Sequence, residues 1–166
     1  MIVLYSSERN SWKIGDFGIT VRGTSKNPIT TNEAKGTACY RAPEILKTVK
    51  GKTKYNNKVD IWAIGCIVYE LTMEKQAFNS DIDTFEWKDQ EKRIPTDVVL
   101  DTAPRELISK IIRKSLRAEP KERSTAKNIC DWLREYLGLS PVESNRLPPI
   151  SETSSLLHDT FASSGR

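Results

Sequence analysis

The triplet Asp16-Phe17-Gly18 is the first stretch of this 166-residue chain whose residue types could do chemistry. A carboxylate supplies the hard oxygen atoms that Mg²⁺ binds in proteins, and such a triplet is typical of chains that handle nucleotide phosphates. In those chains a long domain normally stands in front of the triplet, whereas only 15 residues do so here. Because an isolated triplet is weak evidence, the residues that follow decide its meaning.

A second motif is ACYRAPE, from Ala38 to Glu44, and its last residue lies 28 positions after Asp16. With this pair the sequence resembles the protein kinase family, in which Asp-Phe-Gly precedes an activation loop that Ala-Pro-Glu closes. Further matches come in the family's order: Gly36-Thr37 with Tyr40-Arg41 in the serine/threonine form, DIWAIGCIVYEL over 60–71, Ala77-Phe78, and LRAEPKERSTA over 116–126. The resemblance covers residues 2–137.

The resemblance implies a role for each residue of the first motif. Asp16 would hold Mg²⁺ that bridges the phosphates of ATP. Phe17 would pack inward, and Gly18 would give the turn its backbone freedom. ATP and Mg²⁺ are therefore the cofactors expected of the parent kinase. We expect neither to bind tightly to this chain alone, because a lone carboxylate lacks the co-ligands that the metal needs.

The activation segment, residues 16–44, would bind the protein substrate of the parent kinase. Its substrate-binding residues would be Gly36, Thr37, Tyr40, Arg41, Ala42, Pro43 and Glu44. Thr37 would lie beside the catalytic base and help to shape a site for a Ser or Thr hydroxyl. Thr30 and Thr31 are the best placed candidate phosphosites, and an ordinary polar loop is the open alternative.

Other residues of the matched motifs have structural roles in the family. Glu44 would pair with Arg123 and tie the activation segment to the back of the lobe. Asp60 would accept hydrogen bonds from the backbone of the catalytic loop, although a carboxylate is favoured at a helix start in any case. Trp62 and Gly65 belong to the buried central helix and are expected to be structural.

Most of the apparatus for phosphoryl transfer is missing from these 166 residues. There is no Gly-rich loop, no Val-Ala-Ile-Lys segment and no His-Arg-Asp loop, and the only histidine is His158. We therefore expect a fragment of a serine/threonine kinase, with ATP-dependent phosphorylation of protein Ser and Thr hydroxyls as the parent activity and no activity alone. Two alternatives stay open: a non-catalytic kinase-like binding module, and half of a split kinase that an N-terminal kinase segment completes in trans.

The elements that would position these residues are mainly helical, and the expected fold class is a mainly α, partial kinase-like C-lobe without the N-lobe. Within the domain at 2–137 we expect a β-hairpin at 2–15, the activation segment at 16–44 and a helical part at 45–137. The patterns predict helices at Lys58–Thr72, Arg105–Leu116 and Ala126–Leu137, with Thr125 as N-cap and Gly138 after the last helix. The Ser/Pro-rich tail at 138–166 should be disordered. Since the first of these helices is apolar on nearly every face, it needs neighbours all round and we expect an incomplete fold.

Composition excludes several classes of partner. Lys and Arg exceed Asp and Glu by only 26 to 22, with no basic run that carries interleaved aromatics, so we expect no nucleic acid. The longest apolar run, Ile61–Tyr69, is too short to cross a bilayer of about 30 Å, so we expect no membrane span. Three scattered cysteines indicate reduced thiols and an intracellular location, cytoplasmic or nuclear.

Overall fold

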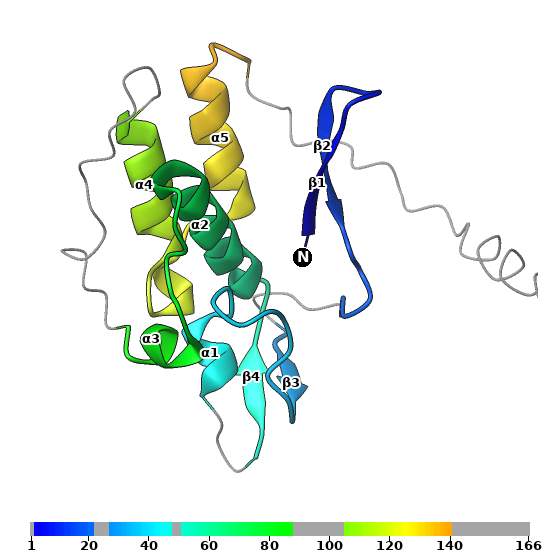
Figure 1. The fold of residues 1–166 in the computed structure, drawn as a ribbon. Helices are drawn as coiled ribbons and strands as arrows, with labels where there is room; N and C mark the ends of the chain where they lie inside the picture. The colour runs from blue at the N-terminus through cyan, green and yellow to red at the C-terminus, as the bar shows by residue number, and fades with distance from the viewer. Residues whose placement is uncertain (1, 22–26, 48–50, 88–104, 141–166) are drawn as a thin grey trace, which may run out of the picture.

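The computed structural model describes residues 2–21, 27–47, 51–87 and 105–140. In these ranges the chain forms five α-helices and two small antiparallel sheets of two strands each (Figure 1). It is therefore a small α/β fragment, with one sheet more than the mainly helical fold that the sequence predicts. The architecture is consistent with part of a protein kinase domain. Of the tail predicted at 138–166, all but the first three residues lie outside the described residues.

The first sheet is the hairpin that the sequence predicts at the front of the chain. Strands β1 (Ile2–Ser6) and β2 (Ser11–Gly15) pair antiparallel, with Ile2 opposite Gly15 and Ser6 opposite Ser11. The rings of Tyr5 and Trp12 lie across the ladder with centroids 5.1 Å apart. Figure 1 shows the hairpin standing apart from the helices.

The second sheet lies where the sequence predicts a loop and then helix. Strand β3 (Ile29–Thr31) pairs antiparallel with β4 (Thr53–Tyr55), and the short helix α1 (Pro43–Leu46) lies between them in the sequence. Strands of three residues carry too little alternation to be recognised locally. Their pairing partners are more than twenty residues apart, so only the folded chain reveals the sheet.

The three longer helices agree with the sequence prediction to within one residue at each end. They are α2 (Lys58–Met73), α4 (Arg105–Ser115) and α5 (Ala126–Tyr136). Thr125 caps α5 by accepting a hydrogen bond from the backbone N–H of Asn128, as predicted. Gly138 follows with a φ of 64°, the left-handed conformation that glycine adopts without strain. A five-residue helix, α3 (Asp81–Phe85), and a 3₁₀ turn, η2 (Pro120–Glu122), complete the described elements.

The core forms where α2 packs against its neighbours. One cluster joins α2 to the residues after it and to the end of α4, and it contains Ala42, Trp62, Cys66, Tyr69, Phe78, Ile112 and Leu116. A second cluster joins α2, α4 and α5 through Ile61, Ile111 and Ile129. Neither cluster contains a residue of β1 or β2. No helix in the described ranges is long and apolar enough to cross a membrane.

Candidate functional site

The Asp16 carboxylate lies in a turn directly after β2. Its φ of 59° is in the left-handed region, which residues other than glycine seldom adopt but Asp tolerates better than most. The Phe17 carbonyl accepts a hydrogen bond of 2.9 Å from the backbone N–H of Thr20 and so closes the turn. The whole turn is exposed, and the carboxylate is accessible to solvent.

Two expectations for this turn are wrong. Phe17 is 65% exposed instead of packed inward, because neither core cluster of the described residues reaches it. Gly18 is not the residue with the left-handed backbone, since that conformation belongs to Asp16. The unusual backbone geometry is therefore at the carboxylate itself, and strained conformations of this kind are concentrated at functional sites.

A Mg²⁺ ion would need more oxygen ligands than this turn offers. In the ranges that the structure describes, no group of three or more His, Cys, Asp or Glu side chains could hold a metal ion. Mg²⁺ requires near-octahedral coordination by oxygen, and Asp16 contributes one carboxylate. The described residues therefore do not fit a magnesium site by themselves.

The segment from Gly36 to Glu44 folds onto the helices through several side chains. Gly36, at a φ of 98°, accepts a hydrogen bond of 2.8 Å from Arg41 Nε through its carbonyl. The Thr37 carbonyl accepts one of 3.3 Å from the N–H of Tyr40, while the Thr37 residue is exposed. Gly36 and Thr37 are thus held by backbone contacts and stay open to a partner.

Two longer contacts fix the segment to elements that come later in the chain. The Tyr40 hydroxyl donates to Glu70 Oε2 on α2, and this hydrogen bond together with burial raises the pKa of Tyr40. Arg41 Nη1 lies 2.6 Å from Asp81 Oδ2 at the start of α3. The sequence analysis missed both contacts, because nothing local to residues 70 or 81 indicates a partner thirty to forty residues earlier.

Glu44 and Arg123 come together in a buried ion pair. Arg123 Nη1 and Nη2 donate to the two Glu44 carboxylate oxygens at 2.7 Å each, and the arginine side chain is fully buried. The other guanidinium hydrogens are donated to three backbone carbonyls, those of Lys58, Arg117 and Ala118. All five donors of Arg123 are therefore used, and the end of the activation segment is held against α2 and η2.

Three further residues of α2 lie as follows. Trp62 is completely buried and lies under the Arg123 guanidinium, 5.0 Å from the ring centroid. Gly65 faces α4, where a Cβ would come within 2.7 Å of the Ser115 Cβ. The Asp60 side chain is at the surface and makes no hydrogen bond with any described residue, and partial desolvation raises its pKa.

The candidate phosphosites Thr30 and Thr31 lie on β3, beside β4. Thr30 is exposed, and Thr31 is half-buried and accepts a hydrogen bond of 3.3 Å from the N–H of Glu33. They are therefore in a strand, not in the irregular polar loop that the composition predicts.

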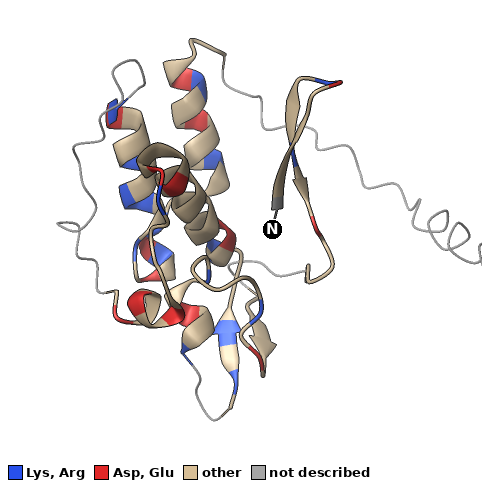
Figure 2. Ribbon diagram, viewed as in Figure 1, with Lys and Arg blue, Asp and Glu red and all other residues tan. Residues whose placement is uncertain are grey.

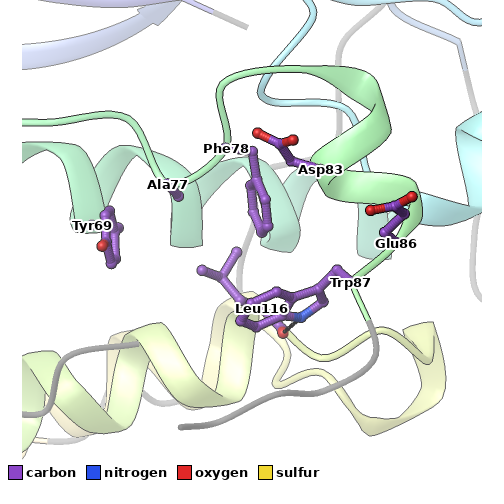
Figure 3. Close-up of a pocket in the computed structure, with 7 residues that line it drawn as sticks. All are labelled: Tyr69, Ala77, Phe78, Asp83, Glu86, Trp87 and Leu116. Carbon is purple, nitrogen blue, oxygen red and sulfur yellow. Dashed lines mark hydrogen bonds between the residues drawn. The ribbon is translucent and has the colours of Figure 1, made fainter. Parts of the chain in front are cut away.

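A pocket of about 240 Å³ lies behind the activation segment, between α2, α3 and the end of α4 (Figure 3). Its apolar wall comes from Tyr69, Ala77, Phe78, Trp87 and Leu116. Trp87 Nε1 donates to the Leu116 carbonyl at 2.9 Å and so fixes one side of the wall. Asp83 and Glu86 bring carboxylates to its rim. None of the site residues that the sequence predicts lines this pocket.

The comparison with protein families decides what this arrangement belongs to. The family model described as protein kinase domain matches residues 2–133. The chain belongs to the protein kinase family. The matched range contains the Asp16 turn, the docked segment at 36–44 and the helices α2, α4 and nearly all of α5.

Individual relatives are serine/threonine protein kinases. The chain is 33% identical to the probable serine/threonine-protein kinase nek3 of Dictyostelium discoideum over 141 residues, which are 80% of this chain and 12% of that protein. It is 32% identical to the serine/threonine-protein kinase PLK1 of Xenopus tropicalis over 152 residues, 87% of this chain and 22% of that protein. Over 68 residues, 41% of this chain and 9% of the relative, it is 48% identical to the serine/threonine-protein kinase Nek8 of Danio rerio. The chain thus spans less than a quarter of the length of these relatives.

Proposed function

We propose that residues 2–133 are the part of a serine/threonine kinase catalytic domain that follows its catalytic loop, in the back half of the C-lobe. The parent enzyme would transfer the γ-phosphoryl group of ATP to Ser and Thr hydroxyls of proteins inside the cell, in the cytoplasm or nucleus. The observation that carries this proposal is the docked activation segment, in which Glu44 is held by Arg123 and Arg41 by Asp81. A peptide-binding segment needs such fixed anchor points, since phosphoryl transfer depends on positioning.

The anchors leave the residues proposed to contact the substrate free to do so. Gly36 and Thr37 are exposed, while Ala42 and Pro43 are buried and act as the base of the segment. Tyr40 and Arg41 are tied to carboxylates of the same chain, so they shape the peptide's path and do not contact it as free charges. The substrate hydroxyl would therefore be placed beside Thr37.

ATP and Mg²⁺ would be cofactors of the parent enzyme and not of these residues alone. Asp16 would supply one carboxylate to the metal, which neutralises charge on the phosphates when bound. The Gly-rich loop, the ATP-anchoring Lys and the catalytic base do not occur in the 166 residues. We infer that this chain alone transfers no phosphoryl group.

A second candidate function is a kinase-like binding module, or a half-enzyme completed in trans. The favouring observation is that the activation segment is anchored entirely by residues of this chain, through α1, α2, α3 and Arg123. A peptide could therefore bind without turnover. The DNA upstream of the Met1 codon distinguishes the candidates, because an in-frame His-Arg-Asp-x-x-x-x-Asn coding segment supports the kinase part and its absence supports the module.

A direct assay tests the inactivity of these residues. Purified chain is incubated with labelled ATP, Mg²⁺ and a basic Ser/Thr peptide, with Asp16→Asn as the matched control. Both proteins should show incorporation equal to a protein-free blank. Incorporation that Asp16→Asn abolishes would overturn the inference.

A further inference from the structure

The exposed face of the β3–β4 sheet carries a threonine opposite a lysine. In the antiparallel register Thr30 lies directly across from Lys54, and both residues are exposed. Directly opposed residues of an antiparallel pair project on the same face with Cβ atoms about 5 Å apart. The flanking pair, Thr31 and Thr53, points to the other face, where Thr53 is only 2% exposed. The Thr30 hydroxyl and the Lys54 side chain therefore share one solvent-facing surface.

A second lysine extends this surface. Lys52 lies two residues before Lys54, and alternate residues of an extended chain project on the same side. Both lysines are exposed, and neither makes a hydrogen bond or an ion pair with a residue in the described ranges. Figure 2 shows the basic residues of β4 in blue beside β3. Two ammonium groups without a carboxylate partner therefore lie next to Thr30, one directly across and one diagonal.

We propose that Thr30 is a phosphorylation site and that Lys54, with Lys52, binds the phosphate across the sheet. A serine/threonine kinase with ATP would supply the group. The bond from Thr30 Oγ1 to the γ-phosphorus forms as the bond from that phosphorus to the bridging oxygen breaks, the hydroxyl proton passes to the kinase's base, and ADP leaves. Phosphothreonine carries a charge of about −1.5 to −2 at pH 7, which two lysines can balance.

The same geometry argues against Thr31 as the site. Its opposite residue is the buried Thr53, and its hydroxyl oxygen already accepts a hydrogen bond from the N–H of Glu33. A phosphate on Thr31 would therefore face the packed side of the sheet, away from both lysines. Thr31 supplies a matched comparison one residue away.

The phosphate would stabilise a sheet that is short by any standard. The β3–β4 ladder has three residue pairs, and an isolated two-stranded ladder is marginal in water. A bridge from Thr30 to Lys54 would join the two segments that flank α1, which contains Glu44. Its regulatory meaning, an ordered activation segment, rests on the proposed function, whereas the contact between phosphate and lysine does not.

The test is a ³¹P NMR titration of the full chain with phosphothreonine incorporated at position 30. Nearby ammonium groups favour the dianion, so the phosphate should lose its second proton at lower pH than in Lys54→Gln and in the double variant Lys52→Gln/Lys54→Gln. We expect about a threefold difference in proton affinity at low salt. Lys75→Gln, an exposed lysine beyond the end of α2, removes the same charge and should leave the titration unchanged.

Amide exchange gives a second readout on the same samples. Phosphate at Thr30 should slow exchange of the amides in β3 and β4, and Lys54→Gln should reverse that protection. Phosphothreonine at position 31 should produce neither effect. Identical titrations in the unsubstituted chain and the double variant, or an equal change with Lys75→Gln, would overturn the proposal. Because no readout here is catalytic, its failure would leave the proposed kinase function untouched.

Discussion

Arg123 shows at the scale of one residue how the activation segment is held. Its planar guanidinium bridges Glu44 and three backbone carbonyls, so its charge is balanced and every N–H is paired within the protein. The family resemblance predicts the pairing with Glu44. The three carbonyl contacts do not follow from the sequence, because backbone groups carry no residue-specific signal.

The first prediction concerns the removal of this guanidinium. Arg123→Ala would leave the Glu44 carboxylate nearly buried without a partner, a change that costs about 3–5 kcal/mol. Since domains have only about 5–15 kcal/mol of stability, thermal denaturation should lose its cooperative transition. Arg123→Lys should also destabilise, because an ammonium cannot reproduce the bidentate fork. Lys121→Ala, an exposed residue of η2, is the control and should melt like the unsubstituted chain. Equal melting of Arg123→Ala would mean that the segment is not docked.

At the scale of elements, the approach of α2 to α4 depends on the absence of a side chain at Gly65. A Cβ at Gly65 would come within 2.7 Å of the Ser115 Cβ and 2.8 Å of the Leu116 Cδ2. Contacts that short are not tolerated, so the two helices would have to separate. The packing of the core around Trp62 and Ile112 is therefore coupled to one glycine.

The second prediction is that Gly65→Ala destabilises the chain. Alanine favours helix by about 1 kcal/mol over glycine, but the overlap with α4 should cost about 1–3 kcal/mol more than that gain. Urea titration followed by far-UV circular dichroism should show a lower midpoint. Cys130→Ala, an exposed change on α5, should leave the midpoint in place. A higher midpoint for Gly65→Ala would show that α2 and α4 are not packed as described.

The elements themselves divide into those that local sequence predicts and those that it does not. Helices α2, α4 and α5 follow from the periodicity and caps of their own residues, and the hairpin follows from its alternation. The β3–β4 sheet and the contact from Tyr40 to Glu70 join segments far apart in sequence, so no local pattern contains them. Phe17 was expected inside because the family places it there, and it is exposed because the described residues offer it no core.

At the scale of the whole molecule, a large apolar surface is exposed on the hairpin. Its exposed apolar residues, 39–69% accessible, are Val3, Leu4, Tyr5, Trp12 and Ile14. On α2, Ile61 and Tyr69 are buried by the neighbouring helices, while Ile64, Ile67 and Val68 are only half-buried. Exposed patches of this kind mark surfaces that pack against other protein.

The third prediction is that these residues alone fold loosely. The chain should show helical far-UV signal together with dye-binding apolar surface and weak NMR dispersion. The double variant Trp12→Ser/Ile14→Ser should reduce dye binding, whereas the same change at the charged positions Glu8 and Arg9 of the hairpin turn should not. A well-dispersed spectrum without dye binding would show that the chain is self-sufficient and would favour the binding module.

The central claim is that these residues form the back part of a serine/threonine kinase catalytic domain. The most direct test joins the front of a related kinase domain, through its catalytic loop, to residues 2–140 and measures phosphoryl transfer from ATP to Ser, Thr and Tyr peptides. We predict transfer to the Ser and Thr peptides that is at least a hundredfold above the blank, on the scale expected for a general base, and that Asp16→Asn abolishes. A fusion that melts cooperatively and binds ATP, yet transfers nothing or is indifferent to Asp16→Asn, would contradict the claim.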